Sequence, residues 1–114
     1  MKSESKLTQA LANAQLEELK SRALVQKCFL LPLKLGGVDE PQNIVWLPPK
    51  CAEIKLQLDS AVEAQVHSSG QKIQYSAVPT FDGDSPIPKS ITIAVKGSTF
   101  DLKRTLVVDD YKEW

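Results

Sequence analysis

Glycine and proline divide this chain unevenly, and their placement constrains the fold more than any other feature of the sequence. Residues 5–27 contain neither, are rich in Ala, Leu, Glu, Gln and Lys, and carry Leu7, Leu11, Leu19 and the Ala23–Leu24 step at helical spacing. We therefore expect a helix here, with an apolar stripe packed on the rest of the chain and a solvated face opposite. A helix that mediates assembly is the alternative.

Beyond residue 27 the chain changes to short apolar segments bounded by turn-forming residues. The run over residues 28–33 is closed by Gly36-Gly37, and the run over residues 43–47 is stopped by Pro48-Pro49. We predict a short strand for each, the first at the edge of a sheet.

A second helix is predicted over residues 51–68, started by the prolines before it and ended by Gly70. Its apolar residues fall on one stripe, which we expect to pack over the two short strands. The stripe comprises Ile54, Leu58, Ala61, Val62 and Val66, whereas Lys55, Asp59 and Glu63 fall elsewhere on the helix.

The remainder of the chain reads as β-structure. Strands are predicted over residues 72–78 and 90–95, with a loop over residues 79–89 between them, and a third strand over residues 99–108. The predicted fold class is therefore α+β, with an N-terminal helix, a ββα core and a C-terminal antiparallel β-meander. We divide it into the helix, residues 1–27, and the ββα unit with its meander, residues 28–114, which together form one compact domain.

Composition excludes several classes of protein. Lys plus Arg and Asp plus Glu number 14 each, so no global positive field would attract nucleic acid. No segment approaches the apolar length that crosses a bilayer, and the first residues lack the apolar core of a secretory signal, so we expect no membrane association and a cytoplasmic protein. Cys28 and Cys51 lack the spacing of a zinc site. We expect free, buried thiols, with one disulfide as the alternative.

Several short motifs follow one another in an order that resembles a known family. Gly36-Gly37 is followed by the strand over residues 43–48, then by a helix ending in glycine. After the helix come the sequence Pro79-Thr80-Phe81, the glycine-serine-proline element of residues 83–88 and the strand of residues 91–95. This order resembles the DNA/RNA non-specific endonucleases of bacterial toxins, and it is also similar to the ββα-metal core of the His-Asn-His nucleases. The resemblance covers residues 30–95.

The residues that catalysis would require in such a nuclease are missing. Phosphodiester hydrolysis at this core needs a histidine as general base and a bound metal ion. Phe29, seven residues before Gly36, stands where the resemblance implies the histidine, and Cys28 stands where it implies Gly or Asp. Lys50 or Ala52 occupies the position of a ligand asparagine. These residues and Asn43 mark a vestigial site. We expect no catalytic residue, metal or cofactor there. Asn43 is predicted to tie the loop to the strand.

Other residues that could carry chemistry favour structural roles. His67, near the end of the second predicted helix, fits a favourable contact with the helix dipole. The segment Asp82-Gly83-Asp84-Ser85 lacks the further ligands of a calcium loop and is predicted to be a turn. Trp46 and Trp114 are the candidates for binding a partner, because aromatic residues dominate interface energetics. Packing of Trp46 under the first helix and of Trp114 on the sheet is the alternative.

Three hypotheses follow. The first is a non-catalytic, nuclease-like interaction protein, bacterial and linked to a toxin–immunity system, which binds a protein partner or itself. The second is a metal-dependent nuclease with relocated groups, for which Asp39, Glu40, Asn43 and Glu53 are the candidates. The third is a weak nucleic-acid-binding module that uses Lys34, Lys50, Lys55 and Lys72.

Overall fold

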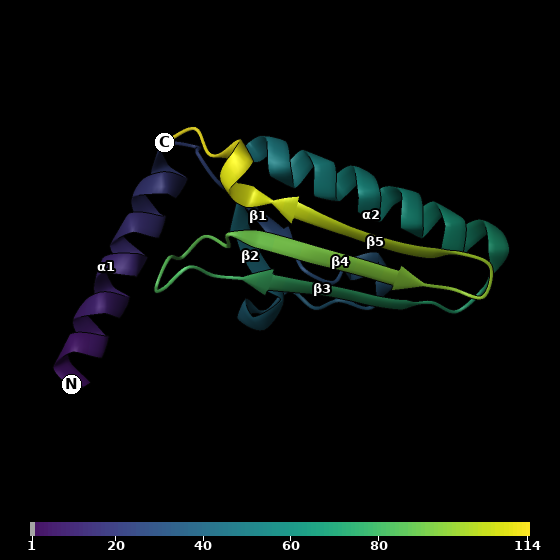
Figure 1. Cartoon of the computed structure of the whole chain (residues 1–114), viewed down its shortest axis with the longest axis horizontal. Coiled ribbons are helices and arrows are strands. Elements are labelled where there is room, and N and C mark those ends of the chain that lie inside the picture. Colours follow the sequence, from purple (N-terminus) through teal and green to yellow (C-terminus); the bar gives the residue numbers. More distant parts are fainter. Residues whose placement is uncertain (1) are drawn as a thin grey trace.

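The computed structural model describes the backbone of residues 2–114 and the side chains of residues 6–114. The predicted α+β class is confirmed, with a helix first and a three-stranded antiparallel sheet last (Figure 1). The α-helices and strands are α1 (Lys2–Ser21), β1 (Gln26–Phe29), β2 (Ile44–Leu47), α2 (Pro49–Ser69), β3 (Gln74–Thr80), β4 (Ser90–Lys96) and β5 (Asp101–Val107), with 3-10 helices η1 (Leu33–Leu35), η2 (Pro41–Asn43) and η3 (Val108–Tyr111).

The three-stranded sheet has the order β3-β4-β5, and its central strand forms the middle of the core. Ile91, Ile93 and Val95 of β4 are fully buried, while Thr92 and Ala94 between them are only partly buried, as the two-residue period of a strand requires. The sheet therefore has one apolar face, which the rest of the molecule must cover.

The pair β1–β2 and helix α2 cover that face. β1 and β2 are antiparallel, with Gln26 opposite Leu47 and Phe29 opposite Ile44. Figure 1 shows this pair behind the three-stranded sheet, with α2 running along the β5 side. Leu47 of β2 and Cys51 of α2 are fully buried in the same apolar cluster as the β4 residues. The ββα unit and the sheet thus share one core.

The first helix ends earlier than the sequence pattern predicts. α1 stops at Ser21, and Ala23 adopts a positive φ of 54°, which turns the chain so that the amide of Leu24 donates to the carbonyl of Leu19 at 3.0 Å. Gln26 and Lys27 then pair with β2 instead of continuing the helix. The prediction of a helix to residue 27 was wrong because strand pairing outweighed the helical propensity of these residues, and no Gly or Pro marks the turn.

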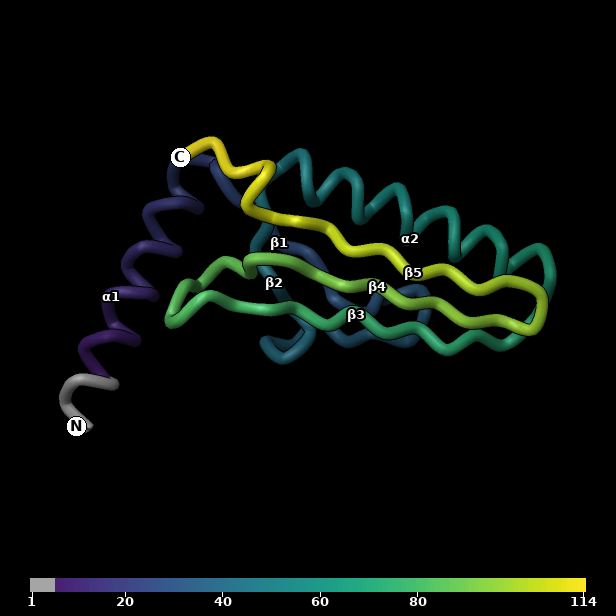
Figure 2. Tube along the Cα trace, viewed as in Figure 1, coloured from purple at the N-terminus to yellow at the C-terminus, as the bar shows by residue number. Residues whose placement is uncertain are grey.

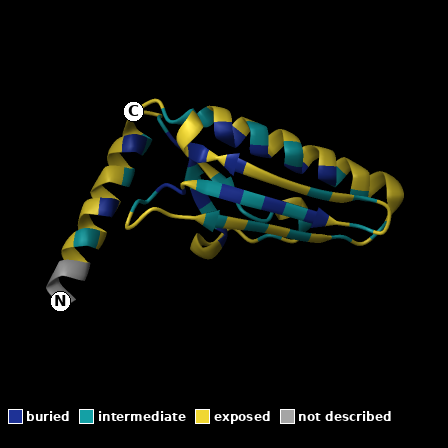
Figure 3. Cartoon of the chain, viewed as in Figure 1, coloured by how far each residue is buried: buried dark blue, intermediate teal, exposed yellow. Residues whose placement is uncertain are grey.

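The apolar stripe predicted for α1 is only partly packed. Leu19 is buried, but Leu7 and Leu11 have exposed fractions of 62% and 63%, so the expectation that they face the core was wrong. The buried face runs through Ala12, Leu16 and Leu19 instead (Figure 3). The molecule measures 51 × 29 × 22 Å, and Figures 1 and 2 show α1 standing beside the body rather than on it.

The remaining predictions of secondary structure differ from the structure at their ends. The first apolar run forms a strand only to Phe29, because Pro32 has no amide hydrogen to donate and the chain turns into η1. Gly70 ends α2 with a φ of 66°, as predicted. β3 continues through Pro79, which an edge strand tolerates.

Candidate functional site

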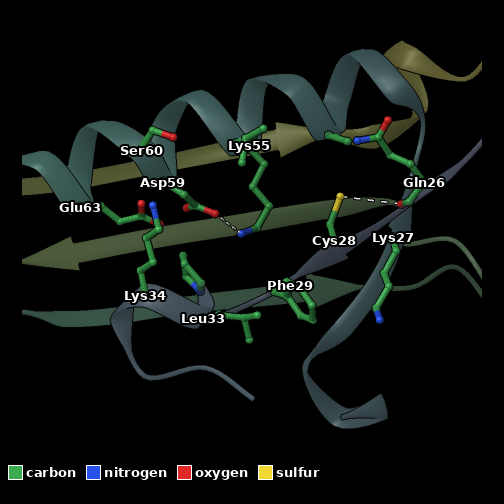
Figure 4. Close-up of a pocket in the computed structure, with 13 residues that line it drawn as sticks. Gln26, Lys27, Cys28, Phe29, Leu33, Lys34, Lys55, Asp59, Ser60 and Glu63 are labelled. Atoms are coloured by element: carbon green, nitrogen blue, oxygen red, sulfur yellow. Dashed lines mark hydrogen bonds and ion pairs between the residues drawn. The ribbon is translucent and has the colours of Figure 1, made fainter. Parts of the chain in front are cut away.

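A cavity of about 380 Å³ opens between β1, the turn that includes η1, and α2 (Figure 4). The resemblance would place a nuclease active site here, between the strand pair and the helix. Its apolar walls are Phe29, Pro32, Leu33, Ala52 and Leu56, its thiol is Cys28, and its polar lining consists of Gln26, Lys27, Lys34, Lys55, Asp59, Ser60 and Glu63. Leu33 and Leu56 also reach solvent, with exposed fractions of 47% and 64%.

An ion pair from α2 lies at the inner end of this cavity. Lys55 and Asp59 are one helical turn apart, and the Lys55 Nζ to Asp59 Oδ2 distance is 2.6 Å. Their side chains are 2% and 8% exposed. The prediction that both lie away from the packed face of the helix was therefore wrong.

Two further groups complete the network around the pair. Lys55 Nζ also donates to the carbonyl of Leu30 at 3.1 Å and to the hydroxyl of Tyr75 at 3.4 Å, which uses its three hydrogens. The Tyr75 hydroxyl donates to Asp59 Oδ1 at 2.5 Å. Burial, and then this hydrogen bond, raise the pKa of Tyr75 well above its ordinary value. Lys55 therefore contributes structure, and its assignment to a nucleic-acid surface was wrong.

The two thiols are free, and each has a raised pKa. Burial raises the pKa of Cys28 from 9.0 to about 12, although the positive charge of Lys55 opposes this rise, and it raises the pKa of Cys51 to about 11. Because the thiolate is the nucleophile and metal ligand, a protonated thiol performs neither role well. The expectation of free thiols is confirmed.

Phe29 gives the cavity a hydrocarbon surface at the position where the resemblance implies a histidine. Its ring centroid lies 5.3 Å from Lys27 Nζ, within the range of a cation–π contact. A phenyl ring has no lone pair for a proton or a metal ion. The described side chains include no group of three or more His, Cys, Asp and Glu residues arranged to hold a metal ion.

Asn43 is buried and holds the loop between β1 and β2. Its Oδ1 accepts from the amide of Leu31 at 2.8 Å, and its Nδ2 donates to the carbonyls of Leu31 and Val38, each at 2.9 Å. The predicted role of tying the loop to the strand is confirmed. The loop also needs Gly37, because a Cβ there would lie 1.9 Å from the carbonyl oxygen of Leu31.

The acidic candidates for a relocated catalytic site do not line the cavity, and two of them have local partners. Asp39 pairs with Lys27 at 2.8 Å, and Glu40 accepts from Gln42 at 2.6 Å. Glu53 is exposed on the first turns of α2 and does not line the cavity.

The remaining lysine candidates are likewise dispersed. Lys50 is exposed at the start of α2, and Lys72 precedes β3; neither lines the cavity, whereas Lys34 does. The structure therefore brings Cys28, Phe29, Lys34 and Lys55 together but leaves Lys50 and Lys72 outside.

The two tryptophans have different environments. Trp46 is partly buried against the core, and Lys20 Nζ of α1 lies 4.0 Å from its ring centroid, which agrees with packing under the first helix. Trp114 has an exposed fraction of 42%, and Lys112 Nζ lies 5.8 Å from its ring centroid.

Two minor candidates have the structural positions that the sequence predicts. His67 is exposed in the last turn of α2, away from the cavity. Residues 82–85 form a turn in which the amide of Ser85 donates to the carbonyl of Asp82 at 3.2 Å, with Gly83 at a φ of 59°.

The network of Lys55, Asp59 and Tyr75 is the feature that sequence reasoning missed. A signal was present, because Cys51, Lys55, Asp59 and Val62 recur at spacings of four, four and three residues, which places them on one helical face. Because two of these four residues are charged, the series does not have the appearance of an apolar stripe.

Comparison with protein-family models, with curated proteins and with solved structures found no match for this chain. Among the described residues, no helix has both the length and the apolar character needed to cross a bilayer.

Proposed function

We propose that this chain is a non-catalytic, nuclease-like binding protein, and that the cavity between β1 and α2 receives an apolar side chain of a protein partner. The observation that carries this proposal is the lining of the cavity. Where the resembled nucleases hold their general base, this chain has Phe29. The charged pair beneath it, Lys55 and Asp59, already has hydrogen-bond partners within the chain.

The cavity has the dimensions and chemistry of a site for an anchor residue. Its volume is at the lower end of the range of small-ligand pockets, and its walls are mainly hydrocarbon. The exposed leucines beside it, Leu33 and Leu56, add apolar surface that a partner would remove from water. The rim carries Lys27, Lys34 and Glu63, in keeping with the polar rim of a protein interface.

The setting in a bacterial toxin–immunity system, as companion of an active nuclease, is also part of the proposal. It is supported by the resemblance of residues 30–95 to the endonuclease family, which is an argument from fold-level analogy.

Incubation of the purified chain with plasmid DNA and with RNA, in Mg²⁺ or Mn²⁺, tests the absence of catalysis. We expect no cleavage. Cleavage that co-purifies with the chain and is lost in Asp39→Ala or Glu53→Ala would establish the relocated nuclease instead, because these exposed residues can be changed without disturbing the core.

Selection of a displayed random-peptide library on the purified chain tests the anchor site. We expect selected peptides to share a large apolar residue and to lose at least tenfold in affinity for Leu56→Asp. Val78→Asp, an exposed substitution on the three-stranded sheet, is the matched control and should leave affinity unchanged. Selection of no peptide, or equal binding to both variants, would refute the site.

A further inference from the structure

Helix α1 carries a second apolar stripe that its own chain leaves exposed. Leu7, Ala10, Leu11 and Ala14 are all exposed and recur at i, i+3, i+4 and i+7. At 3.6 residues per turn they span about 100° of the helix surface, on a line roughly 150° away from the buried face. Figure 3 shows that much of the surface of α1 is exposed.

We propose that this stripe is the contact between two copies of the chain, paired as antiparallel α1 helices. With the two-fold axis between residues 10 and 11, residues that face one another have numbers summing to 21. Leu7 of one copy then meets Ala14 of the other, and Ala10 meets Leu11. Every leucine of the stripe faces an alanine, so each large side chain fills the space that a small one leaves.

The charges beside the stripe fit the same arrangement. Lys6 and Glu17 are exposed and lie on the same side of the stripe, and antiparallel helices bring like sides together. Within its own helix Glu17 Oε1 pairs with Lys20 Nζ at 3.0 Å, so Lys6 of the second copy would join an existing surface ion pair. Lys6 and Glu17 are offset across the interface by two positions, roughly 3 Å along the axis, which is within reach of a lysine side chain. The two-fold axis repeats this ion pair.

The size of the stripe sets the strength of the contact. Residues 7–14 extend only about 10 Å along the helix, which offers far less than the roughly 800 Å² that each partner contributes to a standard interface. The dimer is therefore weak and reversible.

Sedimentation equilibrium over a series of protein concentrations tests the pairing. We expect the average mass to rise from 12.6 kDa toward twice that value. Leu11→Glu should remain monomeric at every concentration while keeping its circular dichroism spectrum, because Leu11 is exposed. Gln9→Glu, an equal change of charge outside the stripe, should associate as the unmodified chain does. A monomer throughout, or equal association of Leu11→Glu, would overturn the proposal.

Cysteine cross-linking tests the orientation. Leu7→Cys/Ala14→Cys should form linked dimers under mild oxidation, whereas Leu7→Cys alone should not, because position 7 of one copy faces position 14 of the other. The seven-residue separation is too long for a bridge within one helix. The unmodified chain controls for Cys28 and Cys51. Equal linkage by the single variant would indicate parallel helices and would overturn the antiparallel register. Absence of linkage in the double variant would overturn it as well. Neither experiment depends on the cavity.

Discussion

Lys55 and Asp59 form a buried ion pair one turn apart on α2, with 2.6 Å between Nζ and Oδ2 and side chains 2% and 8% exposed. Two charges removed from water in this way are tolerated only when each is fully hydrogen-bonded. Here the carbonyl of Leu30 and the hydroxyl of Tyr75 supply the remaining partners. The pair links α2 to β3 and to the segment that leaves β1.

Breaking this pair should be costly. We expect Lys55→Met or Asp59→Asn to lower the free energy of unfolding by about 3–5 kcal/mol, because each leaves an uncompensated group in the core. Urea unfolding measures the change. The exposed ion pair of Lys27 and Asp39 is the control, and Lys27→Met should cost less than about 1 kcal/mol. Similar losses in both pairs would contradict the structural role of the buried one.

Replacing both members of the buried pair shows how much of the loss in unfolding free energy comes from leaving one charge buried without a partner. Lys55→Met/Asp59→Leu should cost less than the sum of the single changes, since no lone charge stays buried. Additive losses would mean that the two side chains act independently.

Asn43→Ala should destabilise the loop between β1 and β2. Three hydrogen bonds are lost, and the amide of Leu31 and the carbonyls of Leu31 and Val38 lose their partner, so we expect a loss of about 2–4 kcal/mol. Hydrogen exchange should show a faster Leu31 amide. Gln42→Ala, on the exposed neighbour, should change neither quantity; an unchanged Leu31 exchange rate in Asn43→Ala would contradict the assignment.

The two tryptophans should respond differently to truncation. Trp46→Ala is expected to lower stability by about 2–3 kcal/mol, because the ring packs against the core beneath Lys20. Trp114→Ala should cost under about 0.5 kcal/mol, as surface substitutions usually do. Thermal unfolding of both variants makes the comparison, and equal effects would show that Trp114 docks in solution.

Stability should fall in alkaline solution through the two thiols. Both have a raised pKa in the folded chain, about 12 for Cys28 and about 11 for Cys51, against an ordinary 9.0. Above pH 9 the unfolded chain therefore releases protons that the folded chain keeps, so unfolding becomes easier as pH rises toward 11. Each retained proton steepens the loss by about 1.4 kcal/mol per pH unit.

Urea unfolding between pH 8 and 11 tests this dependence. Cys28→Ser/Cys51→Ala should show a shallower decline over that interval than the unmodified chain, whatever its stability at pH 8. Parallel curves would show that other groups, among them Tyr75, account for the whole effect.

The sequence by itself determined the types of the main elements and several of their ends. The two-residue alternation of residues 90–95 produced a strand with one buried face, and Gly70 ended α2 in the left-handed conformation that glycine adopts easily. The bonds that Asn43 makes to the loop were predictable for the same reason, since its partners lie within 12 residues along the chain. These features follow from local geometry.

Only the tertiary structure decided which faces of the helices are buried. Leu7 and Leu11 have the spacing of core residues, yet they are exposed because α1 stands beside the body and turns Ala12 and Leu19 inward. Lys55 and Asp59 are residue types typical of a solvated helix face. They are buried here because Tyr75 and the carbonyl of Leu30 supply hydrogen bonds to them in the core. Helical periodicity determines which residues share a face of the helix. Whether that face is buried depends on segments from distant parts of the chain that pack against it.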